Sequence, residues 1–251
     1  MPVKQKFYIF LLSLFVFCSC SKDTTTGLAP VTATNDKVVG ASANELLASS
    51  KYSSLVIEIQ YMPGYTPDPA SVNNLVSFLS NYLNKPSGIR VIQSQIATSG
   101  KSSLTVADAA AIEKTNRTAF NTSTEIAMYI LIADAPYSDP SVLGISYRNT
   151  SVCLFGSVIQ QNSGGVGQVN RTKLYSTVME HEAGHLLGLV NIGTPMVSNH
   201  LDATHGNHCN NQNCLMYYTA ETTDLLGFLL VGNIPTLDMN CINDLRNNGG
   251  R

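Results

Sequence analysis

The chain has 251 residues, a formal net charge of −2, and only 13% charged residues. This length is sufficient for one sizeable hydrophobic core. The near-neutral charge argues against nucleic acid as a partner and provides no basic patch for a membrane surface. We therefore expect a globular domain whose function depends on a local site.

The N-terminus has the order of charged and apolar residues that is typical of a secretory signal. Lys4 and Lys6 precede an apolar run over residues 7–17, which is too short for a permanent transmembrane helix. The run is followed by Ser19 and Cys20. A small residue directly before a cysteine at this place resembles the lipobox of bacterial lipoproteins.

This resemblance implies a signal peptide over residues 1–19 and lipidation of Cys20, with Cys18 as an alternative. The protein would then be exported to a bacterial membrane, such as the outer membrane, facing the periplasm or the exterior. Its only membrane contact would be the lipid anchor. The other interpretation is an ordinary signal peptide. Residues 20–50 contain few large apolar side chains and predict a flexible tether before a domain at 51–251.

Hydrophobic periodicity in the rest of the chain predicts alternating strands and helices. This order favours an α+β fold resembling a three-layer α/β/α arrangement, with a mixed twisted sheet and an irregular C-terminal half. We expect a central strand at 126–132, because this run is almost continuously apolar. The other expected strands are 55–61, 89–96, 143–148 and 152–155, and the expected helices are 43–48, 71–83, 105–120, 178–189, 221–230 and 236–247.

The stretch 178–189 contains the pattern H-E-x-x-H and should be helical, since it lacks proline. His181 and His185 would lie one turn apart on the same face, where both imidazoles can reach one zinc ion. Glu182 can face the same ion without binding it. There it can accept a proton from water whose pKa zinc lowers to about 7. This is the chemistry of the metalloprotease motif.

A catalytic zinc site needs a third protein ligand. The run H-E-x-x-H-x-x-G, which ends at Gly188, resembles the first half of the metzincin signature H-E-x-x-H-x-x-G-x-x-H. In that family the third ligand lies three residues after the glycine. Here that position is occupied by Asn191, a weak zinc ligand. The pattern is therefore interrupted.

The pattern resumes at His208. The segment from His208 to Met216 reads H-C-x4-C-x-M and resembles the corresponding segment of archaemetzincins. Its eight-residue step also matches the step from the third histidine to the Met-turn methionine in matrixins. The resemblance implies that 189–207 is an insertion, that His208 is the third ligand and that Met216 forms a packing floor as a Met-turn. Tyr218 matches the tyrosine that astacin-like and serralysin-like members have near the metal, where its hydroxyl would stabilise an oxyanion.

The inserted segment contains further candidate ligands. His205 or His200 could replace His208 as the third ligand, and we rank them in that order after His208. Together with Asp202, they could instead bind a second metal such as calcium or zinc, or form hydrogen bonds within the loop.

Four cysteines remain once those of the signal region are set aside. An even number in an exported protein predicts disulfides. We favour Cys209–Cys214, which closes a short loop, together with Cys153–Cys241. The alternative is a zinc site made of cysteine and histidine, which suits a reducing compartment better.

The sequence therefore predicts a metzincin-type zinc endopeptidase with one catalytic zinc ion, acting as a monomer on a protein or peptide substrate. The substrate would lie extended along an edge strand within 143–155. One alternative is a surface-binding lipoprotein with a structural zinc ion, and another is a zinc hydrolase of non-peptide bonds. The glutamate between the two helical histidines favours catalysis, because structural sites are usually closed and rich in cysteine.

Overall fold

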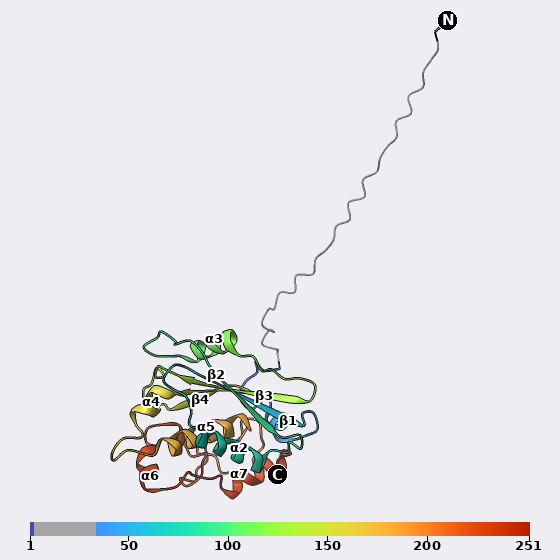
Figure 1. Cartoon of the computed structure of the whole chain (residues 1–251). Coiled ribbons are helices and arrows are strands. Elements are labelled where there is room, and N and C mark those ends of the chain that lie inside the picture. The colour runs from blue at the N-terminus through green and yellow to red at the C-terminus, as the bar shows by residue number, and fades with distance from the viewer. Residues whose placement is uncertain (3–33) are drawn as a thin grey trace.

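The computed structural model describes residues 1–2 and 34–251, and its centre is a five-stranded mixed sheet (Figure 1). The strand order is β2-β1-β3-β5-β4. All neighbours pair in parallel except β4, which is antiparallel to β5 and forms one edge. The strands are β1 (Ser54–Tyr61), β2 (Ile89–Gln95), β3 (Glu125–Ala133), β4 (Gly144–Arg148) and β5 (Ser151–Phe155).

Helices cover both faces of this sheet. In Figure 1, α3 lies on one side, whereas α2, α5 and α7 lie on the other. The expected α+β class with a mixed sheet and an irregular C-terminal part is therefore confirmed. The helices are α1 (Ala43–Leu47), α2 (Pro69–Tyr82), α3 (Val106–Asn116), α4 (Gly156–Gln161), α5 (Arg171–Leu186), α6 (Leu225–Val231) and α7 (Met239–Asn247), with a 3-10 helix η1 (Tyr218–Glu221).

The sheet follows the hydrophobic pattern of the sequence. Strand β3 is central, as expected, and all of its residues after Glu125 are buried, because a parallel strand covered on both faces must be apolar throughout. The edge strand comes from the expected region, since among the described strands β4 pairs with β5 alone. Helix α3 begins with the expected capping box of Thr105 and Asp108.

Three helices differ clearly from the expectation. Helix α3 ends at Asn116 and does not reach residue 120. Helix α5 begins earlier, at Arg171, because the side chain of Asn170 caps it by accepting a hydrogen bond from the amide of Lys173. In the C-terminal half, the expected helix over 221–230 is shorter: its first residue ends η1, and α6 begins only at Leu225. The sequence did not predict α4.

Residues 34–50, within the stretch expected to be a tether, pack against the sheet domain. Leu46 and Leu47 of α1 are fully buried. The side chain of Asn149 donates hydrogen bonds to the carbonyl of Thr34 and to the hydroxyl of Ser42. Cys20 and nearly all of the expected signal peptide lie outside the described residues.

Within the described part of the chain, no helix has both the length and the apolar character that crossing a membrane requires.

A sharp turn at Gly188 ends the helix that carries the histidine motif. Gly188 has φ +74°, and its carbonyl accepts a hydrogen bond from the amide of Thr194 at 2.9 Å. An added Cβ would lie 2.6 Å from that amide nitrogen and 2.7 Å from Cβ of Ala43. Both the conformation and the close packing therefore require glycine here, and they direct the chain away from α5 into residues 189–207.

Replacing Gly188 with alanine should lower the free energy of unfolding by about 1–3 kcal/mol. The left-handed conformation costs an L-residue about 1–2 kcal/mol, and the new methyl group would also press on the next turn. Denaturant unfolding of the purified protein measures the change.

Gly227→Ala is the matched control. Its added Cβ would have no neighbour within 4 Å in α6, and alanine is favoured over glycine inside a helix by about 1 kcal/mol. This variant should keep or gain stability. Equal stability changes in the two variants would show that the turn at Gly188 carries no strain.

Candidate active site

Helix α5 presents two histidines on the same face. Every residue of this helix from Leu174 onward is buried, because α5 packs between α2 and the edge of the sheet. The Nε2 atoms of His181 and His185 lie 3.1 Å apart. The expected spacing of one helical turn thus brings both ring nitrogens to one point.

His208 joins them from the segment that follows the insertion. Its ring centroid lies 5.3 Å from that of His181 and 5.0 Å from that of His185. The structure therefore brings together the three histidines that the sequence ranked first. Their nearest ring nitrogens, together with one carboxylate oxygen of Glu221, all lie within 4.8 Å of one another.

Backbone carbonyls orient two of the three rings. Nδ1 of His181 donates a hydrogen bond to the carbonyl of Leu215 at 2.7 Å. Nδ1 of His208 faces the carbonyls of His205 and Gly206 at 3.1 and 2.9 Å. In a neutral ring a proton on Nδ1 leaves the lone pair on Nε2, so the neutral forms of both rings present Nε2 to the centre of the group as an acceptor.

Glu221, which the sequence did not predict, completes the group. One oxygen, Oε2, lies 3.6 Å from Nε2 of His181 and 3.7 Å from Nε2 of His185. The other, Oε1, lies 3.5 Å from Nε2 of His208. Burial opposes ionisation of this carboxyl, but the three imidazoles outweigh burial and hold its pKa well below the usual value. No motif marks Glu221, because it reaches the site through the turn that follows Met216.

Burial also changes the protonation of the histidines. It lowers the pKa of His185 to about 4, so that this ring is neutral at neutral pH. For His208, burial lowers the pKa, but the Glu221 carboxylate and the backbone carbonyls raise it more, and the net shift is upward. Neutral imidazole is the form that binds metal ions.

Glu182 lies beside the histidines with one oxygen free. The residue is fully buried, and its Oε2 accepts a hydrogen bond of 2.9 Å from the hydroxyl of Ser146 on the edge strand β4. The other oxygen, Oε1, has no hydrogen-bond partner. Burial raises the pKa of Glu182 well above its usual value, and the nearby carboxylate of Glu221 raises it further. Sequence reasoning missed Ser146, because nothing in the pattern of β4 distinguishes it.

Met216 and Tyr218 occupy different positions relative to this group. Met216 is fully buried, and its sulfur would collide with a Cβ on Gly184, so it packs directly on α5 between the two histidines. The ring of Tyr218 stacks on that of His205 with centroids 3.5 Å apart. Within η1 it is the side chain of Glu221, not that of Tyr218, that lies within 4 Å of all three histidines.

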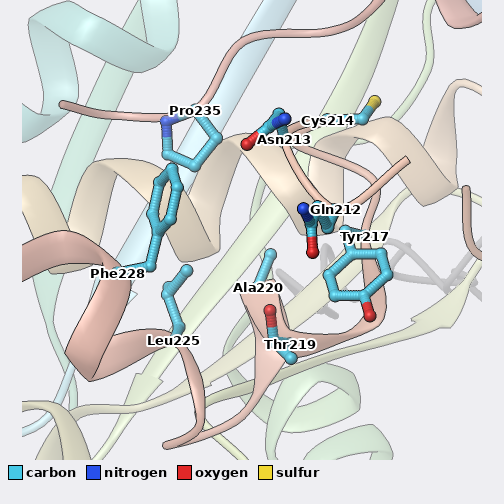
Figure 2. Close-up of a pocket in the computed structure, with 9 residues that line it drawn as sticks. All are labelled: Gln212, Asn213, Cys214, Tyr217, Thr219, Ala220, Leu225, Phe228 and Pro235. Atoms are coloured by element: carbon cyan, nitrogen blue, oxygen red, sulfur yellow. The ribbon is translucent and has the colours of Figure 1, made fainter. Parts of the chain in front are cut away.

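Two cavities lie next to η1. The first, of about 250 Å³, is lined by Glu182, His185, His208 and Glu221 and by residues of β4. The second has a volume of about 320 Å³. Figure 2 shows Phe228 on one side of this second cavity and Tyr217 on the other. Its lining is mixed, with apolar residues from α6 and polar ones from the turn before η1.

The four cysteines are free thiols, so the expected disulfides Cys209–Cys214 and Cys153–Cys241 are absent. The Sγ atoms of Cys214 and Cys241 lie 3.7 Å apart, and Nδ1 of His200 lies 3.4 Å from Sγ of Cys209. These four side chains form a buried thiol group. Cys153 cannot join it, because Cys153 is in the sheet core on β5.

The structure therefore divides the residues for which a second metal was expected. His200 belongs to the thiol group, and its Nε2 lies 2.7 Å from a carboxylate oxygen of the buried Asp244. Asp202 and His205 instead pair with each other at 2.7 Å in the loop. Hydrogen bonds from Cys209 and Cys241 lower the pKa of Cys214, which favours the thiolate that metal binding requires.

No protein-family model matches the chain, and no curated protein matches it. Among solved structures, an archaemetzincin from Methanopyrus kandleri is similar at 16% sequence identity and a TM-score of 0.48, over 78% of this chain and 96% of that one. A metalloproteinase-II from Bacteroides fragilis is similar at 14% identity and a TM-score of 0.47, over 88% of this chain and 59% of that one. Neither likeness bears on activity, which must be inferred from the residues of the site.

Proposed function

We propose that the protein is a zinc-dependent endopeptidase whose metal is held by His181, His185 and His208. The observation that carries this proposal is the convergence of three Nε2 atoms, two of them fixed as acceptors by their Nδ1 hydrogen bonds. The Nε2 atom of His208 is also buried without a hydrogen-bond partner. Ligands at the usual zinc distance of about 2.0–2.1 Å in a tetrahedron lie about 3.3 Å apart, which agrees with the 3.1 Å between His181 and His185.

Glu182 is the proposed general base. Zinc bound at the histidines would polarise the scissile carbonyl and lower the pKa of a water molecule to about 7. Ser146 holds Oε2 of Glu182, which leaves the unpartnered Oε1 available to accept a proton and pass it to the leaving amine. A nearby divalent cation favours the ionised carboxylate and so opposes the effect of burial.

The proposed substrate is a peptide in extended conformation. Among the described residues, β4 is an edge strand of the sheet, and it lies next to the base, because Ser146 on β4 contacts both the side chain and the carbonyl of Glu182. A peptide paired with this edge through backbone hydrogen bonds would lie close to the histidines. We retain Tyr218 as a candidate for stabilising the oxyanion, and Cys20 as the lipid anchor of an exported monomer, as proposals from the sequence.

Two alternatives use the same residues. In the first, the metal is structural; the position of Glu221 favours it, because three histidines and a carboxylate would make a closed four-coordinate site. The unpartnered oxygen of Glu182 favours catalysis, since a purely structural site has no need for a buried free carboxylate. In the second, the enzyme hydrolyses a non-peptide bond.

For the thiol group, we propose a second, structural zinc ion. The donor atoms of His200, Cys209 and Cys241 and one carboxylate oxygen of Asp238 lie within 4.8 Å of one another, and Sγ of Cys214 lies 3.7 Å from Sγ of Cys241. We propose the three cysteines and Nδ1 of His200 as the ligands, a combination typical of structural zinc sites. Asp244 would hold the other ring nitrogen of His200, as carboxylates commonly do for metal-binding histidines.

Glu182→Gln should retain zinc but lose at least about 100-fold in turnover, since general-base catalysis typically contributes about 10²–10⁴-fold. Cleavage of a denatured protein mixture, with and without a chelator, measures the activity. Glu180→Gln is the matched control: Glu180 is a buried carboxyl on the same helix, but it faces a cavity lined by residues of α2. Unchanged proteolysis in Glu182→Gln would refute the proposed mechanism.

Metal content distinguishes the two proposed zinc sites. The wild-type protein should hold two zinc ions per chain after dialysis, and both His208→Ala and Cys241→Ser should hold one, because each removes a ligand from a different group. His205→Ala is the control for His208 and should keep both ions, since its ring contacts Asp202 and Tyr218. Retention of both ions by His208→Ala would contradict the ligand assignment.

A further inference from the structure

We propose that Glu221 is a displaceable fourth ligand of the catalytic metal. In the resting protein its carboxylate would occupy the coordination position that water or a substrate carbonyl needs, and the site would open when this side chain moves into the adjacent cavity. The proposal rests on the proposed function, because it concerns regulation of the same metal site.

The first reason is that the Glu221 carboxylate faces the ring nitrogens of all three histidines at one point. In their neutral form, which binds metal ions, His181 and His208 carry a lone pair on Nε2, because the backbone carbonyls hold the single proton on Nδ1 of each ring. The Glu221 carboxylate faces these lone pairs at 3.6 and 3.5 Å. Among the residues that the structure describes, the ion-pair partners of Glu221 are histidines alone. Facing acceptors repel one another unless a cation lies between them.

The second reason is the spacing of the donors. Ligands about 2.0–2.1 Å from a tetrahedral zinc ion are separated by about 3.3 Å. The contacts between the carboxylate oxygens of Glu221 and the three histidines range from 3.5 to 3.7 Å. A small adjustment of one side chain therefore gives the closed geometry that catalytic sites normally avoid.

The third reason is that the backbone around Glu221 pairs with residues 141–143. These residues directly precede β4, the strand to which we propose the substrate binds. The carbonyl of Glu221 accepts a hydrogen bond of 2.7 Å from the amide of Leu143, and the amide of Thr223 donates to the carbonyl of Ser141 at 2.9 Å. Val142 and Thr222 form an antiparallel bridge. The end of η1 and the extended residue Thr222 are thus paired with the chain directly before β4, and this pairing fixes the backbone from which the Glu221 carboxylate faces the histidines.

The side chain of Glu221 can move without disturbing the core. It is 28% exposed and lines the cavity of about 250 Å³, whereas Glu182 is fully buried. A rotation of the side chain would therefore release the coordination position while the backbone pairing with Leu143 stays intact. Because only the open fraction of molecules can bind a ligand at the metal, the closed state reduces the apparent affinity by that fraction.

The test compares the zinc-loaded wild-type chain with Glu221→Gln and Glu221→Ala. The probe is acetohydroxamic acid, a small chelating ligand that needs open positions on the metal, and its affinity is measured by calorimetry. Loss of zinc to a competing chelator is measured in parallel. Asp224→Asn is the matched control, because it removes an exposed carboxylate from the residues just after η1.

If Glu221 is a displaceable ligand, its two variants should bind the hydroxamate at least about tenfold more tightly. A site that is open in about a tenth of the molecules has an apparent affinity about tenfold lower than a site that is always open. The same variants should lose zinc more readily, since a ligand has been removed. These opposite changes distinguish a ligand from a residue that merely supports the fold. Asp224→Asn should match the wild type in both measurements.

Unchanged hydroxamate affinity and zinc retention in both Glu221 variants would overturn this proposal. The endopeptidase proposal would still stand if Glu182→Gln abolished cleavage. Conversely, the Glu221 variants could bind hydroxamate more tightly and zinc more weakly although the wild-type protein cleaves no peptide. That result would support Glu221 as a ligand and overturn the proposed peptidase activity. The two hypotheses can therefore fail separately.

Discussion

The site depends on an electrostatic constraint: three imidazoles and one carboxylate converge at a largely buried point. Two imidazole nitrogens are held as acceptors by backbone carbonyls, and a carboxylate faces them at hydrogen-bonding distance or slightly beyond. Such an arrangement is unfavourable unless a cation neutralises it. The fold maintains the arrangement through covalent and packing constraints on each ring, so a metal ion is the simplest group that stabilises it.

These constraints come from distant parts of the chain. Helix α5 sets the separation of His181 and His185, and Met216 packs on Gly184 between them. The carbonyl of Leu215, next to Met216, orients the ring of His181. The same short segment therefore packs against the helix and orients the ring of His181. The buried thiol group begins one residue after His208, so a metal bound there would also stiffen the loop that presents the third histidine.

Sequence patterns predicted the elements with regular periodicity. The central strand, the edge strand and the capping box of Thr105 follow from local rules, and so does the pairing of two histidines one helical turn apart. His208 required a resemblance, because nothing local links it to α5. Glu221 and Ser146 were missed, since they reach the site through tertiary contacts from an irregular turn and an edge strand. The disulfide prediction was wrong because cysteine spacing does not reveal that His200 shares their site.

Our two proposals require one site to contain both a free base and a closed ligand set. Glu182 is held by a single hydroxyl, whereas Glu221 is held through its backbone and leaves its side chain able to move. The most direct measurement is an anomalous-scattering map of zinc-soaked crystals. We expect a peak bounded by Nε2 of His181, His185 and His208, with an oxygen of Glu221 beside it. Anomalous density confined to the thiol group, with none between the three histidines, would contradict the proposal that these histidines bind the catalytic zinc ion.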